Sequence, residues 1–177
     1  MIRGGLWAAG LLTLMLAGVI LWHRFGPTPP APPLAPLTER IDLIEIDKSD
    51  RLLTVYRGGE ALRSYQVALG SAPEGDKAQQ GDGRTPEGTF RIDRRNPQSK
   101  FHLSLGINYP QPDDAARAAE RSVSPGGDIF IHGQPKAVAG LITLPGDWTA
   151  GCIAVSNAEM EELWRIAPIG TEVVIRP

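Results

Sequence analysis

The pattern of hydrophobic and polar residues divides the chain into an apolar stretch, a proline-rich stretch and a long region of short alternating segments. The apolar stretch runs from Gly4 to Trp22, nineteen residues without a charged side chain. As a helix it would be about 28 Å long, close to the hydrocarbon thickness of a bilayer. We therefore expect residues 1–25 to form a transmembrane signal anchor. A cleaved signal peptide is the alternative, although no small-x-small cleavage site follows the stretch.

The proline-rich stretch follows directly. Residues 27–36 read PTPPAPPLAP, in which six of the ten residues are proline. Such a run favours an extended polyproline II conformation, which acts as a semi-rigid spacer. We expect residues 26–37 to be a linker that holds a folded domain, residues 38–177, away from the membrane.

The folded region is dominated by short segments of alternating or continuous apolar character, each bounded by glycine, proline or polar turn residues. This pattern is typical of β-strands. The first two segments are separated by the turn sequence Asp47-Lys48-Ser49-Asp50, which predicts a hairpin. Strands are predicted at residues 41–46, 52–56, 63–69, 89–92, 129–131 and 171–175.

Two helices are predicted among these strands. A short one is expected from Asp114 to Arg121, where alanines alternate with charged residues. A second begins at Ser156, which forms a capping-box pattern with Glu159 three residues later. Apolar residues then recur at helical spacing and predict a core-facing stripe: Met160, Leu163, Trp164 and Ala167. The fold class is therefore mainly β with a few α-helices.

Composition and charge exclude several classes of function. The formal net charge is -2, so the chain lacks the basic surface that nucleic-acid binding requires. A single cysteine and three histidines, widely separated, do not have the spacing of metal ligands, and no cofactor motif is present. One cysteine also allows no intramolecular disulfide. An unpaired cysteine is unusual in an exported protein, which favours a reactive thiol over a structural one.

The candidate chemistry lies between Asp128 and Asn157. His132 follows a short apolar strand, and Cys152 follows small residues that lead into another apolar run. A thiol and an imidazole at the ends of two strands are the minimum required for nucleophilic catalysis by cysteine. The alternative is structural, with a small buried cysteine and a histidine satisfied by a local hydrogen bond.

The spacing of these residues resembles the signature of the L,D-transpeptidase catalytic domain, also called the YkuD domain. In this chain sixteen residues separate His132 from Thr149, and Ala150, Gly151 and Cys152 follow. The resemblance covers roughly residues 40–177. It implies a β-sandwich of mixed sheets and a peptidoglycan-modifying cysteine acyltransferase. Such an enzyme forms a thioester with the stem peptide at diaminopimelate, releases D-alanine and transfers the acyl group to an amine.

The resemblance also assigns roles within the site. Cys152 would be the nucleophile and His132 the base that activates it. The backbone carbonyl of Gly133 would orient the imidazole. The backbone N–H groups of Cys152 and Gly151 would stabilise the oxyanion, and Thr149 would fix the loop through its hydroxyl. A papain-like protease is disfavoured, because there the cysteine precedes the histidine in the chain.

Three further residues are candidates for substrate binding: His102, Trp148 and Arg94. His102 lies in a segment similar to Phe-His-x-Ser-Leu in part of the family, which makes it a candidate wall of the cleft. A strand-edge histidine in a polar contact is the alternative. Trp148 either packs on the domain or lines the cleft. Residues 70–84 are rich in glycine but lack a phosphate-binding pattern, so we interpret them as a loop at the rim of the site.

The sequence departs from the family pattern two residues after the cysteine. Many members carry arginine or asparagine there, whereas this chain has Ala154. The missing side chain affects the choice of substrate and acceptor, not the nucleophile or the base. Arg94, Arg95 or Arg84 are candidates to supply the charge. Hydrolysis, including release of lipoprotein from peptidoglycan, therefore remains an alternative to transfer.

The expected partners follow from the resemblance and from the anchor. They are peptidoglycan stem peptides, a lipoprotein as an alternative acceptor, and the bacterial inner membrane with the domain on its periplasmic side. Three readings stay open: a transpeptidase, a carboxypeptidase or amidase that uses water, and a non-catalytic peptidoglycan-binding module. The third is disfavoured because a binding module needs no thiol at this turn.

Overall fold

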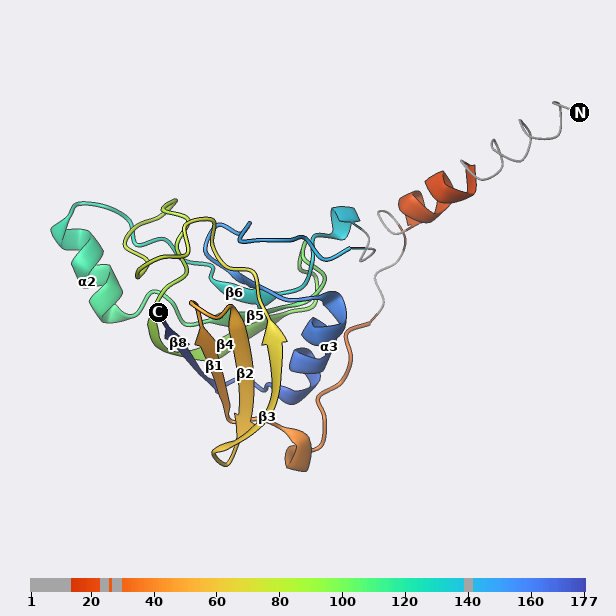
Figure 1. Ribbon diagram of the computed structural model, residues 1–177, viewed down its shortest axis with the longest axis horizontal. Coiled ribbons are helices and arrows are strands. Elements are labelled where there is room, and N and C mark those ends of the chain that lie inside the picture. The colour runs from red at the N-terminus through yellow and green to blue at the C-terminus, as the bar shows by residue number, and fades with distance from the viewer. Residues whose placement is uncertain (1–13, 23–25, 27–29, 139–141) are drawn as a thin grey trace, which may run out of the picture.

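Eight strands form one continuous sheet in the computed structural model, in the order β3-β2-β1-β8-β4-β5-β6-β7 (Figure 1). The structure describes residues 14–22, 26, 30–138 and 142–177. The strands are β1 (Leu43–Asp47), β2 (Leu52–Arg57), β3 (Glu60–Gln66), β4 (Gly88–Asn96), β5 (Ser104–Ile107), β6 (Phe130–His132), β7 (Ile153–Ala154) and β8 (Glu172–Arg176).

The helical elements lie between and beside these strands. They are η1 (Leu37–Glu39), α2 (Pro112–Glu120), η2 (Lys136–Val138) and α3 (Asn157–Ile166). The predicted capping box of α3 is confirmed, because Ser156 accepts the Glu159 N–H and the Glu159 carboxylate accepts the Ser156 N–H. The helix α2 begins two residues earlier than predicted, since Pro112 fits the first turn of a helix, where no N–H partner is needed.

The strands are mixed in direction, as the resemblance implied, but they form one curled sheet instead of two separate ones. β1 pairs parallel with β8 and β6 parallel with β7, and the other neighbours are antiparallel. The long strand β4 connects the two halves: its first part pairs with β8 and its second part with β5. A register shift between Ile92 and Arg94 bends the strand between the two pairings.

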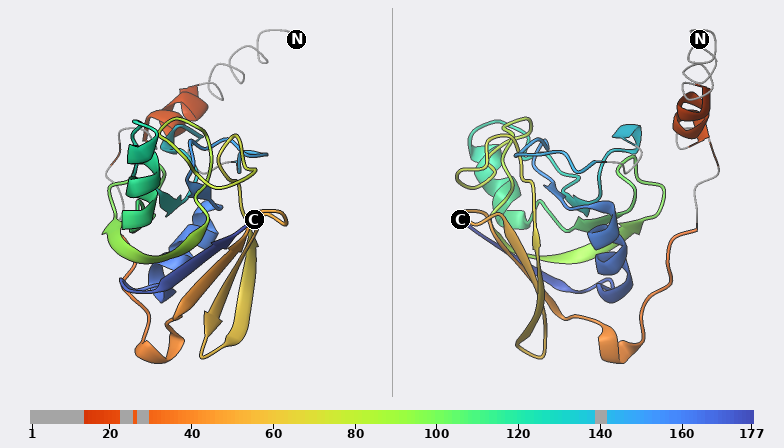
Figure 2. Two further views of the ribbon diagram at one scale, coloured as in Figure 1. Left: turned by 90° about the vertical axis from the view of Figure 1, so that its left-hand side faces the viewer. Right: turned by 45° about the vertical axis from the view of Figure 1, so that its right-hand side comes forward.

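One hydrophobic core spans both halves of the sheet and α3, which packs beside the sheet (Figure 2). In β1 the residues alternate between partly and fully buried, so Ile44 and Ile46 face the core. The predicted stripe of α3 is buried, and Met160 and Leu163 are completely inaccessible to solvent. This core fixes the positions of β6 and β7, whose ends carry the candidate site.

The strand predicted over residues 63–69 is divided between two partners. β3 ends at Gln66, and Ala68 instead pairs with Ala154, each N–H donating to the other carbonyl at 2.9 and 2.8 Å. The second pairing covers the free edge of β7, which is only two residues long. An apolar run does not reveal where its strand partner changes, so the sequence showed one strand.

The predicted transmembrane anchor lies largely outside the described residues. Its residues 4–13 are not described, and residues 14–22 are helical and exposed. Within the ranges that the structure describes, no helix has the length and apolar character needed to cross a membrane.

The proline-rich segment does not extend freely over its described part. Residues 30–36 run beside α3 (Figure 1). The Trp164 indole N–H donates to the Pro32 carbonyl at 2.9 Å, and the Ala35 N–H donates to the Arg165 carbonyl at 2.8 Å. A buried tryptophan needs an acceptor for its N–H, and a proline-rich strand offers free carbonyls. The expected spacer is therefore bound to the domain from residue 31 onward.

Candidate active site

The parallel pairing of β6 and β7 brings the imidazole and the thiol to the same face of the sheet. Ile131 pairs with Ile153 and His132 with Ala154. Because side chains alternate between faces, Cys152 shares the face of Ala154 and therefore of His132. The two functional residues are offset by two positions on adjacent strands, which separates their Cα atoms by about 8 Å. Side chains that extend from Cα atoms at this separation can meet.

A backbone carbonyl orients the imidazole of His132. Its Nδ1 lies 2.7 Å from the carbonyl oxygen of Gly133. A carbonyl oxygen only accepts hydrogen bonds, so Nδ1 carries the proton and Nε2 is left with a free lone pair. Burial lowers the pKa of His132, against the smaller opposite effect of the Gly133 hydrogen bond. The imidazole is therefore neutral at pH 7, as a general base must be.

Two aromatic rings pack against the imidazole, one stacked on its face and one tilted beside it. Phe101 stacks on His132 with ring centroids 4.4 Å apart, and the Trp148 ring lies 5.7 Å away. Trp148 thus packs against the site, and its indole Nε1 is buried without a hydrogen-bond partner among the residues described. Phe101 belongs to the segment that resembles Phe-His-x-Ser-Leu, but it was not predicted as a site residue, because its stacking on His132 depends on the tertiary structure.

The backbone at Gly133 lies so close to Asn157 and Phe101 that a side chain at this position would clash with them. A Cβ atom at this position would lie 2.6 Å from Asn157 Oδ1 and 3.1 Å from the Phe101 carbonyl oxygen. Asn157 Oδ1 also accepts the N–H of Gln134 at 2.8 Å. The carbonyl that orients His132 is therefore held between α3 and the Phe101 segment.

The thiol of Cys152 is protonated at neutral pH. Its Sγ donates to the backbone carbonyl of Asp128 at 3.5 Å. Burial raises the pKa of Cys152, and the charge of Asp128 acts in the same direction; the Phe130 N–H, Lys77 and Arg94 act against it. Thiol and imidazole are thus both neutral in the resting state. The proton must move to the imidazole as the sulfur attacks, which is general-base activation.

The turn before Cys152 is fixed by the Thr149 hydroxyl. This hydroxyl donates to the Cys152 carbonyl at 2.7 Å and accepts the Gly151 N–H at 3.1 Å. Gly151 has φ 130°, and a Cβ atom there would lie 2.6 Å from the Arg84 carbonyl oxygen. The structure corrects one expectation: the Gly151 N–H is already bonded to Thr149, so the Cys152 N–H is the candidate oxyanion donor at this turn.

His102 contacts α3 and is not among the residues that line the cavity beside Cys152. Its Nε2 lies 3.0 Å from the Glu161 carboxylate on α3, and its backbone has φ 66°. This is the polar contact of the alternative interpretation. The sequence could not decide between the two interpretations, because which helix faces the His102 segment is a tertiary property.

The three candidate arginines are engaged elsewhere. Arg95 donates to the carbonyls of Trp164 and Ala167 and stacks on the Trp164 ring. Arg84 donates to the Asp76 carbonyl. Arg94 lies over the Phe130 ring.

Of the three arginines, Arg94 is the one whose charge opposes the raised pKa of Cys152, but two carboxylates already pair with it. It pairs with Asp93 at 2.9 Å and with Asp128 at 3.3 Å. Asp128 is also the residue whose carbonyl accepts the thiol. Arg94 therefore neutralises a carboxylate at the rim of the site.

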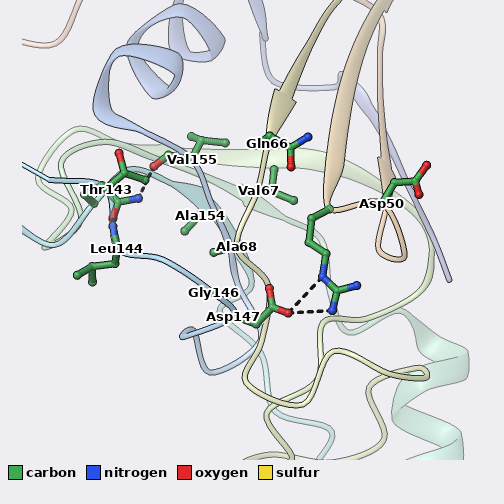
Figure 3. Close-up of a pocket in the computed structure, with 12 residues that line it drawn as sticks. Asp50, Gln66, Val67, Ala68, Thr143, Leu144, Gly146, Asp147, Ala154 and Val155 are labelled. Atoms are coloured by element: carbon green, nitrogen blue, oxygen red, sulfur yellow. Dashed lines mark hydrogen bonds and ion pairs between the residues drawn. The ribbon is translucent and has the colours of Figure 1, made fainter.

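Two cavities adjoin the Cys152 strand. The thiol cavity, about 530 Å³, is lined by Cys152, Asp128, Ser124, Gln80 and Lys77 among others. Loop 70–84 contributes to it, as the sequence predicted for a rim loop. The Ala154 cavity, about 450 Å³, lies beside β7. Figure 3 shows its lining, with Asp147 paired to Arg51 at 3.0 Å.

Within the part of the chain that the structure describes, no group of three or more histidine, cysteine, aspartate or glutamate side chains is placed to hold a metal ion. The chemistry that these residues support is acyl transfer through a thioester, with the imidazole as base and acid.

Comparison with known proteins identifies the domain. Residues 41–175 match the family model YkuD, the L,D-transpeptidase catalytic domain. The protein YafK of Escherichia coli K12, provisionally named an L,D-transpeptidase, is 29% identical over 128 residues, which is 69% of this chain and 45% of YafK.

Solved structures agree. The helical cell shape determining protein Pgp2 of Campylobacter jejuni has 26% identity and a TM-score of 0.61, over 77% of this chain and 47% of Pgp2. Bd1075 of Bdellovibrio bacteriovorus, at 24% identity and a TM-score of 0.57 over 81% of this chain and 50% of Bd1075, shares the fold. This chain spans about half the length of these relatives. It belongs to the family of L,D-transpeptidase catalytic domains.

Proposed function

We propose that the domain is a peptidoglycan-modifying L,D-transpeptidase in which Cys152 is the nucleophile. Cys152 Sγ attacks the carbonyl that joins diaminopimelate to the terminal D-alanine of a stem peptide. Nε2 of His132 takes the thiol proton and gives it to the leaving amine. The carbon–nitrogen bond breaks, D-alanine leaves and the thioester remains. The observation that carries the proposal is the 2.7 Å contact between Nδ1 of His132 and the Gly133 carbonyl, which leaves Nε2 free to act.

The acceptor that we propose is the amine of a second stem peptide. The two cavities support this choice, because one opens at Cys152 and the other at Ala154, two residues further along the strand. The alanine leaves room that a longer side chain would fill. The two cavities together offer space for a donor peptide and an acceptor peptide beside the same thioester. Water and the lysine of a lipoprotein are the competing acceptors.

We also propose that residues 4–22 anchor the domain at the periplasmic face of the inner membrane, where its substrate lies. The uncharged sequence of this stretch supports the proposal. Fractionation of cells that express the full chain tests it. Recovery of the uncleaved protein in detergent extracts of the inner membrane is expected, and recovery in the soluble periplasmic fraction would contradict it.

The activity is tested by mass spectrometry of the purified full chain incubated with disaccharide-tetrapeptide, with Cys152→Ala as the control. Dimers joined through two diaminopimelates are expected, together with free D-alanine. Tripeptide and D-alanine without dimers would replace the amine acceptor with water. A wild-type protein that leaves the tetrapeptide intact would refute the activity. If its thiol also fails to react with iodoacetamide, a binding module would be favoured, whereas a reactive thiol would favour a lipoprotein-linked bond as the substrate.

A further inference from the structure

Two lysines of this domain are buried to the same extent, and each has a carboxylate partner. The side chains of Lys48 and Lys77 are both 3% exposed. Lys48 Nζ lies 2.6 Å from Glu87, and Lys77 Nζ lies 2.7 Å from Asp82. Burying an ammonium group costs free energy unless its donors are satisfied. The two lysines differ in this respect.

Lys48 uses all of its hydrogen-bond donors within the fold. An ammonium group has three N–H donors. Those of Lys48 reach the Gly75 carbonyl at 2.7 Å, the Thr85 carbonyl at 3.2 Å and the Glu87 carboxylate. The role of Lys48 is therefore structural, because its three hydrogen bonds connect the loop before β4 to the end of β1.

Lys77 has two acceptors among the residues that the structure describes. They are the Asp82 carboxylate at 2.7 Å and the Gln79 carbonyl at 3.2 Å. One N–H donor of this buried ammonium group therefore has no partner within the described ranges of the chain. Lys77 also lines the thiol cavity together with Cys152.

The loop does not depend on Lys77 to satisfy Asp82. The Asp82 carboxylate accepts three backbone N–H groups, those of Ala78 at 2.7 Å, Gln79 at 3.0 Å and Arg84 at 3.0 Å. These bonds close the loop on the carboxylate by themselves. A buried positive charge at this position therefore needs an explanation beyond holding the loop.

The thiol cavity has one other charged residue in its lining, and it lies at the surface. The Asp128 side chain is 90% exposed and is paired with Arg94 at 3.3 Å. Its charge is thus screened by solvent and compensated by a cation. In the buried part of the cavity Lys77 is the charge that a ligand meets.

We propose that Lys77 binds a carboxylate of the stem peptide next to the scissile carbonyl. This rests on the proposed function and adds a specificity-determining residue to it. The free donor and the buried positive charge both select an anionic acceptor group, and carboxylates are strong partners for a buried ammonium. The proposed substrate carries two carboxylates close to the reacting bond: that of the terminal D-alanine, and the side-chain carboxylate of diaminopimelate.

The experiment compares three tetrapeptides with wild type and Lys77→Met. One peptide is native, one has a C-terminal amide in place of the D-alanine carboxylate, and one has an amidated diaminopimelate side chain. In wild type, kcat/KM is expected to fall roughly 10- to 100-fold for the peptide that lacks the recognised carboxylate. In Lys77→Met the same peptide is expected to react at the rate of the native one. Whichever amide is affected identifies the carboxylate.

Lys48→Met is the matched control, because it removes an equally buried ion pair outside the thiol cavity. It is expected to lower stability and to keep the wild-type discrimination between peptides. Lys77→Arg retains the charge and serves as the second variant, with partial discrimination expected. Circular dichroism and a cooperative urea unfolding transition check that each variant is folded.

Two outcomes would overturn the assignment while leaving the proposed function intact. In one, wild type cleaves both amidated peptides as fast as the native one. In the other, Lys77→Met slows all three peptides equally, which would make Lys77 structural. A wild type that cleaves none of the three would refute the proposed function and the role of Lys77 with it.

Discussion

The hydroxyl of Thr149 makes two hydrogen bonds inside the catalytic turn, and their loss has a calculable effect on stability. Thr149→Val keeps the shape of the side chain and replaces the hydroxyl with a methyl group. The residue is 6% exposed, so water cannot replace the lost partner. Both the bond to the Cys152 carbonyl, 2.7 Å, and the bond from the Gly151 N–H, 3.1 Å, disappear.

The expected cost follows from these two bonds. A buried N–H left without an acceptor costs about 1–3 kcal/mol, and a net hydrogen bond contributes about 1 kcal/mol. We therefore expect Thr149→Val to lower the free energy of unfolding by about 2–4 kcal/mol. Thr149→Ser keeps the hydroxyl and removes one methyl group, which costs about 1 kcal/mol. The contrast between the two variants isolates the hydrogen bonds from the packing.

Urea unfolding followed by circular dichroism measures both variants against wild type. The slope of the free energy with urea should stay the same, so that the midpoints report stability alone. kcat should also fall in the valine variant, because the turn that presents Cys152 is no longer fixed. If valine costs no more stability than serine, the hydroxyl does not hold the turn and the reasoning is wrong.

Three further predictions concern the imidazole, the thiol and the linker. Gly133→Ala places a Cβ atom 2.6 Å from Asn157 Oδ1 and displaces the carbonyl that orients His132. Steady-state kinetics should show a kcat/KM at least about tenfold lower. An unchanged kcat/KM would contradict the orienting role of this carbonyl. Burial lowers the pKa of His132 and raises that of Cys152. The acid limb of kcat/KM should therefore lie below about pH 6.5, and iodoacetamide alkylation should still accelerate above about pH 8.5; an acid limb above the first value would argue against a buried neutral base. Trp164→Phe removes the indole N–H that donates to the linker, so the linker amides should exchange hydrogen faster at unchanged activity, whereas equal exchange would mean that the bond does not hold the segment.

Short sequence patterns were enough to predict the main residues of the candidate site. The interval between His132 and Thr149, and the Gly151-Cys152 pair after it, are properties of the chain alone and are retained in any fold that the chain adopts. The same is true of the capping box at Ser156, since its partners are three residues apart. Alternation of apolar residues likewise predicted the β1–β2 hairpin, because strand neighbours joined by a tight turn are determined locally.

Contacts between distant segments had to come from the structure. His102 meets Glu161 across 59 residues, and the Trp164 indole meets a linker carbonyl across 132 residues. No periodicity predicts such pairs, because each depends on how α3 packs on the sheet. The sequence also did not show that the Thr149 hydroxyl accepts the Gly151 N–H, which makes this N–H unavailable to an oxyanion. The direction of a hydroxyl two residues away is known only once the conformation of the turn is known.

The sequence by itself determined the mainly β class and the nucleophile and base expected from the family pattern. The tertiary structure decided which charges reach the thiol. Lys77 and Lys48 look alike in the sequence, each a lysine among turn residues. Only the packed loops show that one ammonium group has three acceptors and the other two, beside a cavity that contains Cys152. The physical reason is that satisfying a buried charge depends on partners from several segments, and the chain order does not specify their meeting.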